Sequence, residues 1–306
     1  MATPYEVFEL GGVEVKLSNP DKVYFPACGV TKGELAHYYV DCADAVLNHV
    51  RERPTMLKRY AGGIDEKPFY QKRVPAKRPE WLQTAVLRFP SGRTAEELVP
   101  VDAAHLVWAV SLGNIDFNPH PVRRADLDHP DELRVDIDPM PRATWDKVRR
   151  TALLARDVLE EHGLRGFPST SGSRGMHIPV RIHPRWDFGT VRRAALALAR
   201  EVERRGGGIA TAKWFKQDRP QDAVFVDYNQ NAKDHTVASA YSVRPVADAR
   251  VACGLDWDEV ADCEPGDFTV RTVPARLKRR GDPNADIDAH PGSLDSLLAI
   301  AGEDED

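Results

Sequence analysis

The chain has 306 residues, of which 42% are hydrophobic and 29% are charged, so it can form a sizeable globular core. No apolar run approaches the length needed to span a bilayer, and residues 1–6 carry neither a basic region nor an apolar stretch. We therefore expect a cytoplasmic protein with no membrane partner. The four cysteines have neither CxxC nor zinc-finger spacing, which argues against a disulfide framework and a structural zinc site.

The net charge of −5 conceals an uneven distribution of charge. Residues 286–306 contain seven acids and no Lys or Arg; without them 42 basic and 40 acidic side chains remain, a net charge of +2. We expect this acidic tail to be disordered. Residues 51–93 hold eleven Lys or Arg against four acids, interleaved with aromatic residues. This composition suits either a nucleic-acid groove or a solvated surface over core aromatics.

In the N-terminal part, residues 14–17 are predicted to form a short strand and residues 31–49 a helix. The helix start is marked by Thr31 and Glu34, the pattern of a capping box. Residues 104–110 are predicted to be extended.

In the C-terminal part, residues 145–162 and 190–205 have the periodicity of amphipathic helices. Strands are predicted before, between and after them, at residues 133–139, 176–182, 223–228 and 236–243. Strands mixed with helices predict an α/β (α+β) fold in which helices cover a sheet.

The strand predicted at residues 133–139 (LRVDIDP) carries two aspartates, Asp136 and Asp138. Because successive side chains of a strand point to opposite faces, both carboxylates share one face. Two carboxylates so close repel each other unless a cation lies between them, and oxygen ligands suit Mg²⁺ or Mn²⁺. Since the same pattern occurs on solvent-exposed edge strands, the pair indicates a metal site only together with other residues.

Residues 168–177 (PSTSGSRGMH) form a Ser- and Gly-rich loop between the two predicted helices. Glycines let backbone N–H groups approach an anion, the hydroxyl of Ser171 adds a donor, and Arg174 and His177 add positive charge or hydrogen bonds. The loop therefore suits a triphosphate. It lacks the GxxxxGK[ST] pattern, however, and a flexible connection has the same composition.

A third acid, Asp227, ends a β-branched and aromatic run and precedes Tyr228 and three amide side chains. Alone this pattern also fits a turn. Together, however, the Asp pair, the loop and Asp227 match the requirements of two-metal phosphoryl transfer. In that reaction two ions hold the attacking hydroxyl and the leaving pyrophosphate.

These three segments, in this order and spacing, resemble the three motifs of the archaeo-eukaryotic primase superfamily and are most similar to those of the polymerase domain of bacterial DNA ligase D. The similarity extends over residues 16–282 and includes 17–23 (LSNPDKV) and 240–245 (AYSVRP). It implies one primase-polymerase domain over residues 1–285. A part that grips the template and the DNA end would lie at about 1–100, and a two-layer catalytic part with mixed sheets and flanking helices at about 101–285. No KxDG ligase motif occurs, so we expect a stand-alone polymerase.

The resemblance also implies roles for individual residues. Asp136, Asp138 and Asp227 would bind two Mn²⁺ or Mg²⁺ ions, and Asp227 would help to activate a primer 3′-hydroxyl. The incoming NTP or dNTP would be held by six side chains: Ser171, Arg174, His177, Arg244, Gln230 and Lys58.

Contacts with DNA follow from the same resemblance. Asn19, Lys22 and Lys32 would bind a 5′-phosphate at the far side of a gap or break, whereas composition alone predicts ordinary surface residues there. Phe69 and Tyr70 would stack on template or nucleotide bases, and Arg59 would lie nearby.

One position departs from the family pattern. Residues 115–120 (IDFNPH) have Asn118 where many relatives have a histidine. Either Asn118 or His120 is expected to take over its place in the active site.

The resulting prediction is a template-directed DNA or RNA polymerase that fills gaps or processes ends in DNA repair. Its partners would be double-stranded DNA with 5′-phosphate ends, Ku and a separate ligase, in the nucleoid region of a bacterial cytoplasm. A metal-dependent nuclease is an alternative, since it also needs clustered carboxylates but no triphosphate-binding loop. A non-catalytic binder of 5′-phosphorylated ends is another, and it would need the basic residues but not the aspartates.

Overall fold

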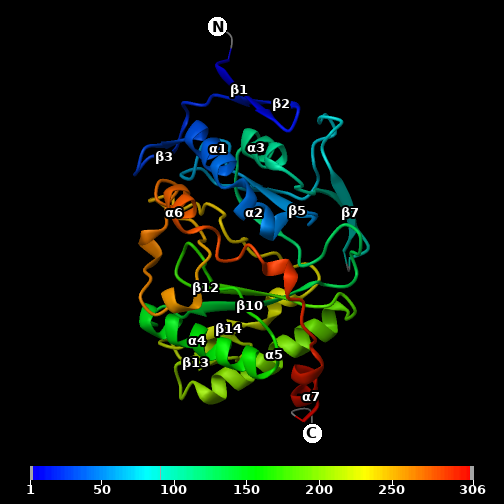
Figure 1. Cartoon of the computed structure of the whole chain (residues 1–306), viewed down its shortest axis with the longest axis vertical. Helices are drawn as coiled ribbons and strands as arrows, with labels where there is room; N and C mark the ends of the chain where they lie inside the picture. The colour runs from blue at the N-terminus through cyan, green and yellow to red at the C-terminus, as the bar shows by residue number, and fades with distance from the viewer. Residues whose placement is uncertain (1–2, 90, 304–306) are drawn as a thin grey trace.

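The structure of the protein is a computed structural model, and it describes residues 3–89 and 91–303. The molecule is elongated, and the N- and C-terminal halves of the chain are stacked along its long axis, except that α6 (Val273–Arg280) returns to lie beside the first helices of the N-terminal half (Figure 1). Among the described residues, no helix has both the length and the apolarity needed to cross a membrane.

The N-terminal half consists of short strands and three helices. In chain order these are β1 (Tyr5–Leu10), β2 (Val13–Ser18), β3 (Val23–Phe25), β4 (Val30–Thr31), α1 (Lys32–Asp41), α2 (Ala43–Val50), β5 (Thr55–Arg59), β6 (Phe69–Gln71), β7 (Thr84–Arg88), β8 (Thr94–Leu98), α3 (Ala103–Ser111) and β9 (Asn114–Pro119). Strands β1 and β2 form a hairpin, as do β3 and β4. The larger sheet has the order β6-β5-β8-β7, and β9 also pairs with β5.

The C-terminal half contains the second large sheet and its helices. They are β10 (Glu132–Pro139), α4 (Trp145–Glu161), β11 (Ser169–Thr170), β12 (Met176–Arg181), α5 (Phe188–Arg205), β13 (Ala210–Thr211), β14 (Val224–Asp227), α6 (Val273–Arg280) and α7 (Asp295–Glu303). Short 3-10 turns are η1 (Lys216–Asp218), η2 (Tyr228–Asn231), η3 (Trp257–Glu259), η4 (Pro265–Asp267) and η5 (Ile287–Ala289).

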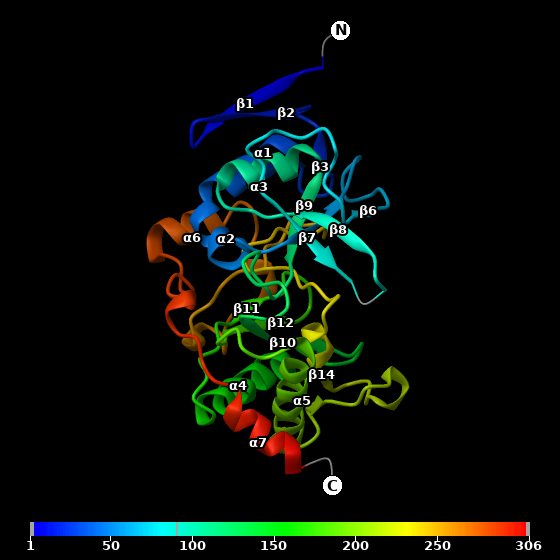
Figure 2. The ribbon, with the colours of Figure 1, turned by 90° about the vertical axis from the view of Figure 1, so that its right-hand side faces the viewer.

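The second sheet has the order β11-β12-β10-β14-β13, and β10 is its central strand. All pairs are antiparallel except β13–β14. Helices α4 and α5 contact β10 and β14 and cover one face of the sheet, as the side view shows (Figure 2). The predicted α/β fold with helices covering a sheet is confirmed.

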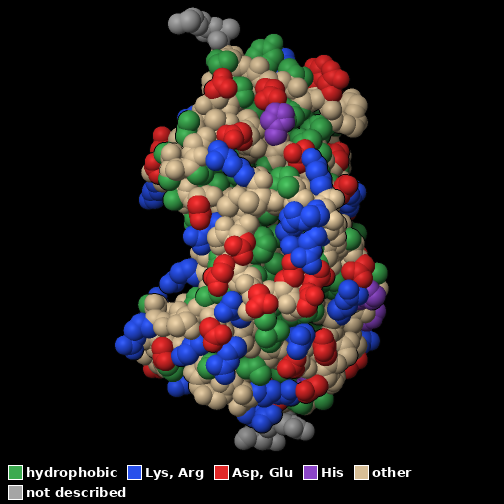
Figure 3. Space-filling model, turned by 60° about the vertical axis from the view of Figure 1, so that its left-hand side comes forward, with side chains coloured by type: hydrophobic (Ala, Val, Ile, Leu, Met, Phe, Trp, Pro, Cys, Tyr) green, Lys and Arg blue, Asp and Glu red, His purple; other side chains and the backbone are tan. Residues whose placement is uncertain are grey.

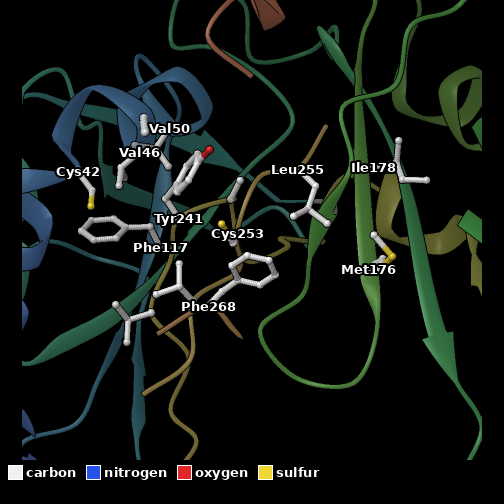
Figure 4. Packing of buried hydrophobic residues seen from close by; sticks show 14 of the residues in the cluster. Cys42, Val46, Val50, Phe117, Met176, Ile178, Tyr241, Cys253, Leu255 and Phe268 are labelled. Carbon is white, nitrogen blue, oxygen red and sulfur yellow. The ribbon is translucent and has the colours of Figure 1, made fainter. Parts of the chain in front are cut away.

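Buried hydrophobic side chains form one large cluster that reaches from Phe8 to Leu297. Figure 4 shows part of it, with Val46 and Phe117 of the N-terminal half on one side and Ile178 of β12 on the other. Residues of the later chain lie between them: Tyr241, Cys253, Leu255 and Phe268. The two halves therefore share a continuous apolar core. All four cysteines are free thiols.

Two predictions in the N-terminal half need correction. Residues 104–110, predicted to be extended, lie in α3, whose start is capped by Asp102: Oδ1 accepts hydrogen bonds from His105 N (3.1 Å) and Nδ1 (2.7 Å). A short, continuously apolar run has no periodicity that separates a buried helix from a buried strand. The helix predicted at 31–49 has the capping box between Thr31 and Glu34, but it is divided at Cys42 into α1 and α2.

Residues 236–243, predicted to be a strand, contain only an isolated bridge from Val243 to Val251. The prediction of a disordered tail is wrong for its described part, residues 286–303. Helix α7 packs on α5, and Leu294 and Leu297 are buried. The acids of the tail pair with arginines of the C-terminal half: Asp286 with Arg165 (2.9 Å), Asp288 with Arg181 (2.6 Å) and Asp295 with Arg185 (2.5 Å). These partners neutralise the charge that composition alone counts as a reason for disorder.

Candidate active site

Three aspartates meet at the centre of the second sheet. In the register of the strands, Asp136 on β10 is opposite Asp227 on β14 and opposite His177 on β12. Asp138 lies two residues further along the same face of β10. One carboxylate oxygen from each aspartate lies within 4.8 Å of the others, the only such group of possible metal ligands in the part of the chain that the structure describes.

Crowding and desolvation shape the electrostatics of this cluster. Burial, with repulsion from Asp138 and Asp227, raises the pKa of Asp136 well above its ordinary value of 3.8. Desolvation and the charge of Asp227 also raise the pKa of Asp138. Mg²⁺ and Mn²⁺ prefer hard oxygen ligands, and a cation would relieve the repulsion between these three carboxylates. The residues therefore fit such an ion.

The turn that follows Asp227 holds its carboxylate in place. Its Oδ1 accepts a hydrogen bond from Asn229 N at 2.9 Å, and its Oδ2 accepts one from Gln230 Nε2 at 2.9 Å. The Asn229 side chain is held in turn by Arg192 Nε at 2.8 Å. The amides that follow the strand therefore position the third carboxylate, and Gln230 lies directly against it.

The Ser- and Gly-rich loop connects β11 to β12 and lies against β10. Ser171 Oγ accepts hydrogen bonds from Ser173 N (3.2 Å) and Gly175 N (3.0 Å), which holds the loop closed. A Cβ at Gly175 would lie 2.2 Å from the Ile137 carbonyl oxygen, so only glycine allows this approach. Arg174 is exposed, and its charge acts on Asp138.

His177 lies at the start of β12, beside the carboxylates. Its Nε2 is 3.5 Å from Asp136 Oδ1, and its Nδ1 is 3.2 Å from the Ala238 carbonyl. Burial and the charge of Arg244 lower the pKa of His177 to about 3, so the ring is neutral near pH 7.

Arg244 approaches the site from the segment that crosses between the two halves. Its Nη1 is 3.8 Å from Asp116 Oδ2 on β9, and both Nε and Nη1 are buried with no hydrogen-bond partner among the described residues. Asp116 also influences Lys58 on β5: although burial lowers the pKa of that lysine, the charge of Asp116 and a hydrogen bond with Tyr60 raise it overall. Asp116 thus brings two cations together.

Three functional candidates were not indicated by any sequence pattern. Arg219 stacks on Phe225, 3.3 Å from the ring centroid, and its charge acts on Asp227 and Asp138. Asp116 approaches the predicted site residue Arg244, and Arg192 donates to Asn229, whose backbone N–H holds Asp227. Arg219 lies shortly before Asp227, and Asp116 lies within residues 115–120, but only the spatial contacts show that these side chains belong to the site.

A separate group of cations lies in the N-terminal half. Lys32 is buried, and its Nζ donates to the carbonyls of Ser18 (3.1 Å) and Ser111 (2.8 Å). Burial and the charges of Lys22 and Arg59 lower the pKa of Lys32 to about 8, which shows that the three cations are neighbours.

The residues around Lys22 complete this group. Lys22 is exposed and donates to the Ala61 carbonyl at 2.8 Å. Asn19 lies in the turn before it, with a φ of 52°, and its carbonyl accepts from Lys22 N at 3.1 Å. The structure thus brings Asn19, Lys22 and Lys32 together at one place on the surface.

The aromatic pair predicted to stack on bases lies on β6 and is exposed, Phe69 by 46% and Tyr70 by 63%. In the register of β5 and β6, Arg59 is opposite Phe69 and Lys58 is opposite Tyr70. The Arg59 guanidinium lies 4.8 Å from the Phe69 ring centroid and Lys58 Nζ lies 5.8 Å from that of Tyr70. Cations and aromatic faces therefore share one exposed surface.

Asn118 and His120 have different surroundings. His120 is buried, with Nε2 3.2 Å from Glu97 Oε2 on β8. Asn118 is half-buried and lies on the same strand face as Asp116, whose carbonyl accepts from Asn118 Nδ2 at 3.4 Å. Of the two, Asn118 lies beside Asp116, the residue that approaches Arg244.

A sheet that carries clustered carboxylates beside a glycine-rich loop, backed by helices, is the architecture of a metal-dependent nucleotidyltransferase. Residues 31–284 match the family described as the LigD primase-polymerase domain, and the chain belongs to this family.

Relatives with curated descriptions agree with this assignment. The chain is 30% identical over 285 residues to the multifunctional non-homologous end joining protein LigD of Mycolicibacterium smegmatis, covering 92% of this chain and 37% of that protein. It is 25% identical over 280 residues to the bifunctional LigD of Bacillus subtilis, covering 91% and 45%. The chain thus spans less than half the length of these relatives.

A solved structure shares the fold. The polymerase domain of Mycobacterium tuberculosis ligase D in complex with DNA superimposes with a TM-score of 0.84 and 29% sequence identity, covering 90% of this chain and 99% of that one. The predicted primase-polymerase architecture is confirmed by this likeness.

Proposed function

We propose that the protein is a template-directed nucleotidyltransferase that adds ribo- or deoxyribonucleotides to a primer 3′-hydroxyl at gaps or ends during DNA repair. The observation that carries this proposal is the triad of Asp136, Asp138 and Asp227 on two paired strands, with the anion-binding loop directly beside it. The reaction is attack of the hydroxyl on the α-phosphate of a nucleoside triphosphate with release of pyrophosphate.

The three aspartates would hold Mn²⁺ or Mg²⁺, which when bound supplies a Lewis acid for the phosphoryl oxygens. Asp227 orients the primer hydroxyl, because its own two oxygens are fixed by Asn229 and Gln230. Asp136 and Asp138 lie on the strand next to the glycine loop and therefore face the nucleotide. From the family we expect Mn²⁺ to support activity best.

The phosphates of the nucleotide would be bound by the cations and hydrogen-bond donors at the loop and beside the carboxylates. Arg244 has two buried nitrogens with no hydrogen-bond partner among the described residues, and Arg174 is exposed at the loop. Ser171 shapes the loop, and Lys58 adds a cation from the N-terminal half. His177, whose Nδ1 donates to the Ala238 carbonyl, would donate to a phosphate from Nε2 only in its protonated form. Charge-assisted hydrogen bonds to phosphate are the strong ones, so Arg244 should contribute most.

The N-terminal part of the chain, at about residues 1–100, would bind the DNA. The cations around Lys32 suit a 5′-phosphate on the far side of a gap, and exposed Phe69 and Tyr70 suit stacking on template bases. Double-stranded breaks and gaps, Ku and a ligase are the partners that this role would require, in the cytoplasm.

The test is primer extension on a one-nucleotide gapped duplex, with and without a downstream 5′-phosphate, in Mn²⁺ or Mg²⁺ and with ribo- or deoxyribonucleotides. We expect templated addition that the phosphate enhances and that Asp138→Ala reduces by at least about a thousandfold, because the metal loses one of three ligands. Asp128→Ala, which removes an exposed carboxylate that pairs with Lys233, is the matched control and should retain full activity.

The two alternatives give different products. A nuclease would shorten the primer and release nucleotide monophosphates without pyrophosphate. A non-catalytic binder would retain the phosphorylated gap without extending it under any metal, and Asp138→Ala would then change nothing.

A further inference from the structure

Strand β10 carries a row of charged side chains on the face that bears the carboxylates. Glu132, Arg134 and Asp136 alternate with buried apolar residues, so they follow one another on this face. Arg134 and Asp136 are almost completely buried, with 5% and 6% of their surface exposed. None of the sequence motifs accounts for a buried arginine at this place.

Arg134 is held through two of its three nitrogens. Its Nε donates to Glu132 Oε1 and its Nη2 to the Pro119 carbonyl, each at 2.8 Å. Its Nη1 is buried and has no hydrogen-bond partner among the described residues. Because a buried donor without a partner is costly, this nitrogen calls for a group that the protein itself does not supply there.

Asp136 presents the complementary atom. Its Oδ1 is buried and accepts no hydrogen bond within the described part of the chain, and the nearest ring nitrogen, His177 Nε2, is 3.5 Å away. An unsatisfied donor and an unsatisfied acceptor thus belong to side chains two positions apart on one strand face.

Both side chains line the same small cavity. Its volume is about 30 Å³, and Glu132, Ser169, His177 and Ala238 also contribute to its wall. The space that the centre of a water can reach in it therefore exceeds the roughly 10–15 Å³ that one ordered water needs, and a polar cavity with two or more partners typically holds ordered water.

We propose that the cavity holds a water that accepts a hydrogen bond from Arg134 Nη1 and donates one to Asp136 Oδ1. Arg134 is thereby a positioning residue for a metal-binding carboxylate. The water fixes one oxygen of Asp136 and leaves the other for a cation shared with Asp138 and Asp227. The role toward the metal rests on the proposed function, whereas the water itself does not.

The first test is a high-resolution crystal structure of the metal-free protein. We expect an ordered water within hydrogen-bond distance, about 2.7–3.2 Å, of both Arg134 Nη1 and Asp136 Oδ1. Clear density for both side chains with an empty cavity, or with a direct Arg134–Asp136 ion pair, would overturn the proposal.

The second test measures the dissociation constant of Mn²⁺ alone, by EPR of the free ion, in Arg134→Met, Arg134→Lys and Arg181→Met. Loss of a partner of a metal ligand weakens affinity by about 10–100-fold, so the constant should rise at least about tenfold in Arg134→Met. Arg134→Lys should recover part of the affinity, because an ammonium group also donates to water. Arg181→Met removes another partner of Glu132, on β12, and should lower the unfolding temperature without changing Mn²⁺ affinity.

An unchanged or smaller dissociation constant of Mn²⁺ in Arg134→Met would refute the positioning role. A smaller dissociation constant is expected if the guanidinium acts only by repelling the ion. If Arg134→Met does not fold, the crystal structure decides. If the wild-type protein binds no Mn²⁺, the proposed function fails. The electron density in the cavity still shows whether the proposed water is present.

Discussion

At the scale of single residues, the site has an electrostatic cost when no cation is bound. Three carboxylates lie together, and the pKa of Asp136 and that of Asp138 are raised by desolvation and mutual repulsion. An acid whose pKa is higher in the folded state binds more protons folded than unfolded. Its favourable contribution is therefore present below pH 3.8 and is lost as the pH rises through the folded pKa.

Asp136→Asn should accordingly stabilise the metal-free protein at neutral pH, because it removes a buried, repelled charge. We expect its unfolding temperature in EDTA to exceed that of the wild type by a few degrees, at about 2–4 °C per kcal/mol for a large domain. The difference should shrink toward pH 4, and Mn²⁺ should stabilise only the wild type. Thermal unfolding followed by circular dichroism measures this, and a variant less stable than the wild type in EDTA would contradict it.

The sequence predicted the three aspartates as metal ligands, because both the alternation of a strand and the motifs of the family can be recognised from the local spacing of residues. It did not identify Arg219 or Asp116, since their relevance comes from the charge of Arg219 near Asp227 and from the approach of Asp116 to Arg244, which only the fold shows.

At the scale of elements, the C-terminal segment is the clearest departure from expectation. Composition marks it as acidic, yet α7 packs on α5 and the acids before it pair with arginines of the C-terminal half. Asp288 pairs with Arg181, which also pairs with Glu132 on β10. The segment is thus tied to the strand that carries the active-site aspartates.

Leu297→Ala should lower the free energy of unfolding by about 2–4 kcal/mol, because this side chain is completely buried between α7 and its neighbours. Urea unfolding gives the value, and Ala299→Ser, an exposed change on the same helix, is the control with an effect within about 0.5 kcal/mol. An equal, small effect of both changes would mean that α7 is not docked in solution.

At the scale of the whole molecule, one core joins the two halves, and the candidate site draws on both of them. Asp116 of the N-terminal half is near Arg244, and its charge acts on Lys58. The surface is indented at mid-height, between the halves, and acidic and basic side chains are intermingled over the face in Figure 3. For the DNA binding that we propose, local groups of cations rather than the net charge of −5 would therefore have to attract the nucleic acid.

Lys32 provides a test of this view. Its pKa of about 8 implies that the preference for a 5′-phosphate over a 5′-hydroxyl on a gapped duplex falls as the pH rises through that value. Lys32→Gln should remove the preference, about tenfold in affinity, together with its pH dependence. Lys16→Gln, which removes an exposed cation on the neighbouring hairpin, should retain both. Fluorescence anisotropy measures the affinities, and a preference that survives in Lys32→Gln would place the phosphate elsewhere.

The sequence by itself determined the helices α4 and α5, the central strand with its two aspartates, the glycine loop and the family. These depend on periodicity or on local spacing, which neighbouring residues specify. The tertiary structure alone decided that residues 104–110 are helical, that the acidic tail is folded, and which distant groups surround the aspartates. The physical reason is that burial and ion pairing depend on partners that are remote in the chain.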